Sequence, residues 1–135
     1  MRSVLHTSAV TEQIPLTFDD EVAISIVTIA ELHFGVMVAT DHRIRGERLR
    51  LLSALQSQFE PLPVDGPVAT AYGRLAAAVT ASGREAGARV NDLLIAATAV
   101  AHRARIVTRY PSDLAGMEDL VEIVTLWSET TPHIS

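Results

Sequence analysis

Cysteine and lysine are both absent from this 135-residue chain, and only 4% of its residues are aromatic. Without cysteine the chain forms no disulfide, no thiolate-bound zinc site and no cysteine nucleophile. The two longest apolar runs, residues 22–30 and 93–101, extend over about nine residues, roughly half of what crosses a bilayer. The sequence therefore predicts neither a disulfide scaffold nor a protein that spans a membrane.

The overall composition is that of a folded domain, with 48% hydrophobic and 20% charged residues. A chain of this length buries roughly two thirds of its unfolded surface, which is enough for a core without covalent support. Arg2, a short apolar stretch and then Glu12 do not resemble a secretory signal. No repeat or linker divides the chain. We expect one domain over residues 1–135 that works in the cytoplasm.

Charge is distributed unevenly along the chain. The net charge is −5, which argues against a protein that binds nucleic acid through its overall charge. All eleven basic residues are arginine, and ten of them lie within residues 41–109. An all-arginine complement is what a GC-rich genome produces, but it also suits contacts with phosphate. The basic middle of the chain is therefore a candidate surface for a nucleic-acid backbone.

Hydrophobic patterns predict strands that alternate with helices. Thr28, with Glu31 three residues later, has the spacing of a capping box at the start of the first of these helices. The expected strands are residues 3–5, 21–27, 105–108 and 120–124, with a short extended stretch at 62–64, and the other helices are residues 43–59, 65–81 and 93–102. This order predicts an α/β fold with a mainly parallel sheet covered by helices.

Four side chains that can bind a cation or transfer a proton are expected just after strands or at the starts of helices: His6, Glu31, Asp92 and Asp113. Each carboxylate also has a purely structural explanation, since Glu31 can close a capping box, Asp92 can favour a helix N-terminus and Asp113 can form a turn. Ligands of parallel sheets bind beyond the carboxyl ends of the strands, where all four residues are expected. Carboxylates about 4 Å apart repel by roughly 4 kcal/mol at an effective dielectric constant near 20, so a cluster needs a neutralising cation. Mg²⁺, which prefers oxygen ligands, is one such cation.

Three segments of the chain resemble the motifs of PIN domains, and most closely those of VapC-type toxins of bacterial toxin–antitoxin pairs. These segments are Val27-Thr28-Ile29-Ala30-Glu31-Leu32, Asn91-Asp92-Leu93-Leu94-Ile95-Ala96-Ala97-Thr98-Ala99, and Ile106-Val107-Thr108-Arg109 followed by Pro111-Ser112-Asp113-Leu114. The opening Val4-Leu5-His6-Thr7-Ser8-Ala9 is similar to the first-strand motif of the family. The resemblance covers nearly the whole chain, and the segment around Asp92 is its most specific part.

The resemblance implies a PIN-like α/β/α sandwich and a metal-dependent endoribonuclease that cleaves structured RNA and is silenced by a cognate antitoxin. The catalytic and metal-binding residues would be Glu31, Asp92 and Asp113, with Mg²⁺ or Mn²⁺ as the cofactor. Ser8 and Thr108 would supply supporting hydroxyls, and Arg89 and Arg109 would approach RNA phosphates. The family also implies a homodimer and a first helix, which would have to fit between residues 9 and 18 with Pro15 interrupting it.

One residue departs from the family pattern at the first motif, because His6 stands where the family has an aspartate. Imidazole binds Mn²⁺ or Zn²⁺ but is a poor ligand for Mg²⁺, and it removes one negative charge from the cluster. His6 is therefore an additional candidate metal ligand. A second hypothesis follows from it: a PIN-fold protein of weakened or absent activity that binds its antitoxin or RNA.

Overall fold

All the strands of the described residues run parallel in one sheet. The computed structural model describes residues 2–10 and 21–126. Strands β1 (Arg2–Leu5) and β3 (Arg105–Thr108) lie in the centre, with β2 (Glu21–Ala23) beside β1 and β4 (Ile123–Thr125) beside β3. Each of the three pairings is parallel, which confirms the predicted α/β class.

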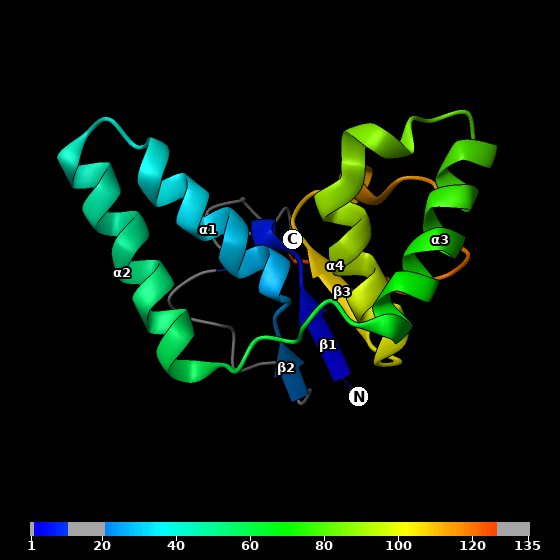
Figure 1. The fold of residues 1–135 in the computed structure, drawn as a ribbon, viewed down its shortest axis with the longest axis horizontal. Helices are drawn as coiled ribbons and strands as arrows, with labels where there is room; N and C mark the ends of the chain where they lie inside the picture. Colours follow the sequence, from blue (N-terminus) through cyan, green and yellow to red (C-terminus); the bar gives the residue numbers. More distant parts are fainter. Residues whose placement is uncertain (1, 11–20, 127–135) are drawn as a thin grey trace, which may run out of the picture.

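Helices cover the two faces of this sheet (Figure 1). Helices α1 (Ile26–Val38) and α2 (His42–Gln58) lie on one side, and α3 (Gly66–Ala81) and α4 (Val90–Ala101) on the other. The central strands supply side chains to both cores, because successive residues of a strand point to opposite faces. Val4 and Ile106 pack in the core with α3 and α4, whereas Leu5 and Val107 pack with α1 and α2. The predicted α/β/α sandwich is thereby confirmed.

The first helix begins earlier than the sequence predicts. Strand β2 ends at Ala23 rather than at residue 27, and Ser25 caps α1 by accepting a 3.0 Å hydrogen bond from the backbone N–H of Val27. The expected capping box of Thr28 and Glu31 is therefore wrong, since a serine three residues earlier takes the N-cap. Both residues lie inside α1, and their side chains are available for other contacts.

Other predicted boundaries shift by a few residues. Helix α3 starts one residue later than predicted, because Asp65 is its N-cap and accepts a hydrogen bond from the backbone N–H of Val68. Gly83, beyond the end of the helix, adopts a φ of 85°. The buried helix expected at residues 93–102 starts at Val90, and the last strand starts at Ile123 instead of residue 120. The stretch at residues 62–64 contributes a single bridge between Leu62 and Ser25 rather than a strand.

Three short 3₁₀-helices complete the described chain: η1 (Thr7–Ala9), η2 (Ala86–Arg89) and η3 (Pro111–Leu114). The helix expected between residues 9 and 18 falls mainly outside the described residues, which resume at Glu21. In the part of the chain that the structure describes, no helix is both long enough and apolar enough to cross a membrane.

Candidate functional site

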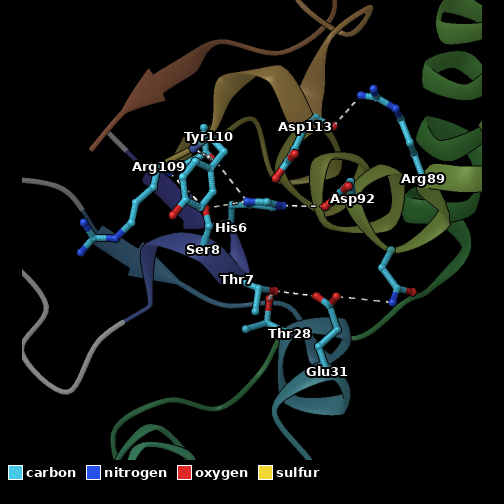
Figure 2. A network of polar contacts seen from close by, with 12 residues as sticks. His6, Thr7, Ser8, Thr28, Glu31, Arg89, Asp92, Arg109, Tyr110 and Asp113 are labelled. Atoms are coloured by element: carbon cyan, nitrogen blue, oxygen red, sulfur yellow. Dashed lines mark hydrogen bonds and ion pairs between the residues drawn. The ribbon is translucent and has the colours of Figure 1, made fainter. Parts of the chain in front are cut away.

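A buried histidine occupies the centre of the carboxyl edge of the sheet (Figure 2). His6 follows β1 directly, its backbone N–H donates to the carbonyl of Val107, and its relative exposure is only 3%. The ring Nε2 lies 2.6 Å from Asp92 Oδ1. An ionised carboxylate can only accept, so we assign the hydrogen of this contact to Nε2. Two residues of the predicted cluster, His6 and Asp92, are thus bonded to each other within the chain.

Two hydroxyl groups hold the other side of the His6 ring. Nδ1 lies 2.9 Å from Ser8 Oγ and 3.0 Å from Thr108 Oγ1. The backbone fixes both hydroxyls in turn, because the N–H of Arg109 donates to Ser8 and that of Tyr110 donates to Thr108. Ser8 and Thr108, predicted to support the site, therefore surround His6 and orient its ring.

Asp92 lies in the first turn of α4, where the positive end of the helix dipole favours a carboxylate. Its side chain makes no capping contact with its own helix, and 28% of that side chain is exposed. The helix therefore delivers Asp92 to the edge of the sheet, and its place in the first turn also agrees with the structural explanation of a helix N-terminal acid.

Glu31 belongs to a second group of polar contacts. Thr7 Oγ1 donates to Glu31 Oε1 at 2.6 Å, and the same hydroxyl lies 3.1 Å from Thr28 Oγ1, which is fully buried. Asn91 Nδ2 lies 3.5 Å from Glu31 Oε2. Thr7 of η1 and Asn91 of α4 therefore orient the carboxylate, and Thr28 of α1 contacts Thr7 from the other side.

Sequence reasoning did not assign Thr7, Thr28 or Asn91 to the site, although each stands in a quoted motif. Two signals could have identified them. Thr28 precedes Glu31 by three residues, which places both on one helix face once the helix is known to start at Ile26. Thr7 and Asn91 are the immediate neighbours of residues that the motifs already mark.

Asp113 reaches the same edge from η3, and its side chain points toward the His6–Asp92 pair (Figure 2). Arg89 binds this segment rather than a carboxylate: its Nη1 donates to the carbonyl oxygens of Ser112 and Asp113 at 3.1 and 2.9 Å. Arg89 therefore links the start of α4 to η3 and fixes the backbone that carries Asp113.

The two residues after β3, Arg109 and Tyr110, lie at the rim of the site. The side chain of Arg109 points away from the carboxylates (Figure 2). Tyr110 is 59% exposed at the same edge. Arg109 thus contributes its backbone N–H to the cluster, while its guanidinium lies outside it.

A hollow of about 340 Å³ contains both Glu31 and Asp92 in its lining, together with Arg89 and Asn91. Within residues 2–10 and 21–126, no three His, Asp or Glu side chains converge closely enough to form a ready-made metal site. Mg²⁺, however, is commonly bound through one or two carboxylates, waters and substrate phosphates rather than by a protein cage. The two carboxylates and the open hollow fit a hydrated divalent cation of that kind.

Comparison with known proteins identifies the family. The PIN domain model matches residues 4–111, so the chain belongs to the PIN domain family. The chain is 36% identical over 104 residues to ribonuclease VapC5 of Mycobacterium tuberculosis, an alignment that covers 77% of this chain and 74% of that protein. It is 38% identical over 106 residues to ribonuclease VapC4 of the same organism, with 78% of each chain covered.

Solved structures agree with these relatives. The chain is similar to a member of the VapBC family of toxin–antitoxin systems, VapBC-5 of M. tuberculosis, with a TM-score of 0.77 and 35% identity over 93% of this chain and 98% of that one. VapBC2 of Rickettsia felis, bound to a DNA fragment from its promoter, has a TM-score of 0.73 at 24% identity over 95% of this chain and all of the other. The second likeness supports the fold alone.

Proposed function

We propose that the chain is an endoribonuclease toxin that hydrolyses phosphodiester bonds in structured RNA, requires Mg²⁺ or Mn²⁺ and is neutralised by a cognate antitoxin. The observation that carries this proposal is the delivery of Glu31, Asp92 and Asp113 to one sheet edge by three different elements. The relatives named as ribonucleases supply the reaction class.

Asp92 and Glu31 would hold the cation, with Asp113 nearby. A bound divalent cation supplies charge to stabilise the phosphate in the transition state and lowers the pKa of a coordinated water. The chain's own residues orient these groups: Thr7 directs one oxygen of Glu31, and Arg89 fixes the segment of Asp113. Arg109, whose guanidinium lies outside the cluster, is available to an RNA strand that enters from its side.

The test is cleavage of a structured RNA, such as a transfer RNA pool, by the purified chain freed of any antitoxin. We expect endonucleolytic products with Mn²⁺ or Mg²⁺, none with EDTA, and none from DNA of matched sequence. Addition of the antitoxin should stop the reaction. Equal cleavage in EDTA would rule out the proposed chemistry.

A second candidate function is a PIN-fold protein that binds its antitoxin or RNA with little or no cleavage. The observation that favours it is the bond between His6 and Asp92, because it occupies the carboxylate on which the reaction depends. Retained RNA or antitoxin binding without products in any divalent cation would support this candidate.

The antitoxin would bind along the exposed apolar side of α1. Phe34 and Met37 there are 68% and 76% exposed. A groove of about 350 Å³ lined by Val27, Ala30, Glu31, Phe34 and Asn91 runs beside them. Glu31 and Asn91 line both this groove and the hollow at the carboxylates. A segment with apolar side chains and a basic residue would therefore fill the groove and neutralise the cluster at once.

Phe34→Ala is expected to weaken antitoxin binding by at least about tenfold, because exposed aromatic side chains are common anchors of protein interfaces. Binding is measured by calorimetry or by the antitoxin dose that stops cleavage. Leu49→Ala on α2, which is 49% exposed but outside the groove, is the matched control. Unchanged affinity of Phe34→Ala would exclude this surface.

Two further parts of the proposal concern assembly and location. The homodimer implied by the family stays a prediction, which light scattering of the purified chain tests. A nuclease that acts on cellular RNA under the control of an antitoxin would work in the cytoplasm.

A further inference from the structure

The carboxylate on which the proposed reaction depends most is already bonded within the chain. Asp92 Oδ1 accepts from His6 Nε2 at 2.6 Å, a short hydrogen bond to a charged group. Such bonds are stronger than those between neutral groups. A cation that binds Asp92 weakens this bond, because it either displaces the hydrogen from Oδ1 or draws charge away through the other carboxylate oxygen.

His6 cannot easily follow or release its partner. Its relative exposure is 3%, its Nδ1 contacts Ser8 and Thr108, and its backbone N–H is bonded to β3. If Asp92 turns away, the Nε2–H is left buried without a partner, and an unsatisfied buried donor costs its full desolvation energy. The fixed ring thus opposes any rearrangement of Asp92.

The carboxylate of Glu31 is also hydrogen-bonded within the chain, but by neutral side chains. Glu31 is bonded to Thr7 and approached by Asn91, and no three acidic or histidine side chains converge in the described residues. The edge therefore has carboxylates of the right chemistry, but each of them is already bonded to another side chain of the protein.

We propose that His6 is a built-in competitor of the catalytic cation: it holds Asp92, so that the free protein binds divalent cations weakly and the cation is retained only together with an RNA phosphate. The proposal rests on the cation site of the proposed function and adds its regulation. RNA would supply the phosphate oxygens that offset the loss of the His6–Asp92 bond. His6 is a positioning residue in this scheme, because it acts through Asp92 and is too buried to touch RNA.

The test is Mn²⁺ binding to the full chain without RNA, followed by electron paramagnetic resonance or calorimetry. His6→Asn is the decisive variant, since the asparagine amide can replace the Nδ1 contacts to Ser8 and Thr108 but ends short of Nε2. We expect it to bind Mn²⁺ about tenfold or more tightly than the native chain, because one hydrogen bond to the charged carboxylate is removed. His6→Asp should bind still more tightly through its added carboxylate.

Three results would overturn the proposal. Equal Mn²⁺ binding by His6→Asn would show that His6 has no effect on the cation, and weaker binding would show that His6 is a ligand rather than a competitor. Tight binding by the native chain that Asp92→Asn does not reduce would place the ion elsewhere. No binding by any variant, including His6→Asp, would remove the cation site as well, and with it the metal requirement of the proposed function. RNA cleavage, assayed separately, distinguishes failure of the competitor from failure of the nuclease.

A matched control variant and a second measurement test whether a change in Mn²⁺ affinity comes from the bond between His6 and Asp92. His33→Asn removes a histidine on the exposed part of α1 and should leave Mn²⁺ affinity unchanged. Thermal unfolding shows whether each variant is folded. In the native chain, the hydrogen-bonded Nε2–H of His6 should give a downfield proton resonance that shifts when Mg²⁺ and a non-cleavable RNA are added together. A resonance that stays unchanged while both bind would contradict the competition.

Discussion

Asp92→Asn is expected to lower RNA cleavage by at least about 100-fold, because it removes a ligand of the cation that would stabilise the transition state, and loss of one such stabilising group commonly costs 10² to 10³ in rate. The fold should survive, since the asparagine carbonyl oxygen can still accept the hydrogen bond from His6 Nε2. The variant therefore changes the charge at the edge of the sheet and leaves the buried contact in place.

The measurement is the single-turnover rate with a structured RNA at saturating Mn²⁺. Glu47→Gln is the matched control, because it removes a surface carboxylate of α2 whose one ion pair among the described residues is with Arg43 at 3.3 Å. Its rate should equal that of the native chain. A rate for Asp92→Asn within threefold of native would show that the reaction takes place elsewhere.

Leu75→Ala is expected to lower the free energy of unfolding by about 2–5 kcal/mol, the usual cost of truncating a fully buried leucine. Leu75 has a relative exposure of 0% and belongs to the core formed by α3, α4 and the sheet. Because α4 carries Asp92 in its first turn, loosening this core should also reduce cleavage.

Urea unfolding followed by circular dichroism measures this loss. Leu49→Ala on α2 provides the control, because Leu49 is 49% exposed and its truncation should change stability by about 0.5 kcal/mol or less. A loss below about 1 kcal/mol for Leu75→Ala would mean that the α3–α4 layer contributes less to the fold than its burial indicates.

The helix and sheet layers could be predicted from the sequence because short segments already show the hydrophobic pattern of buried strands and helices. The runs Val4-Leu5 and Ile106-Val107 have two buried faces, which is typical of central parallel strands. The alanine-rich run that follows Asp92 predicts a helix buried on most sides, and α4 is that helix. Both features depend on local composition, which a single sequence displays.

The contacts of the site could not be predicted in the same way, because they join residues far apart in the chain. Ser25 and Thr28 are both good N-caps, and only the end of β2 at Ala23 decides between them. The bond between His6 and Asp92 spans 86 positions, so spacing carries no information about it. The sequence also does not show that Arg109 contributes its backbone N–H to the cluster while its guanidinium points away from it.

The three carboxylates share an edge for reasons that lie in the topology. β1 and β3 are adjacent and parallel, so the residues that follow them meet at one end of the sheet. α1 begins just beyond the carboxyl end of β2, and α4 begins at the same edge. Charge of one sign therefore gathers at this edge, where the positive end of α4 partly offsets the repulsion at Asp92.

The most direct test of the central claim is to map the RNA ends produced from total RNA by the native chain and by Asp92→Asn, each in Mn²⁺ and free of antitoxin. We predict a small set of defined internal cuts with the native chain and none of them with the variant. Identical cuts from both proteins, or no cuts from the native chain in Mn²⁺ or Mg²⁺, would contradict an RNA-cleaving site built on Asp92.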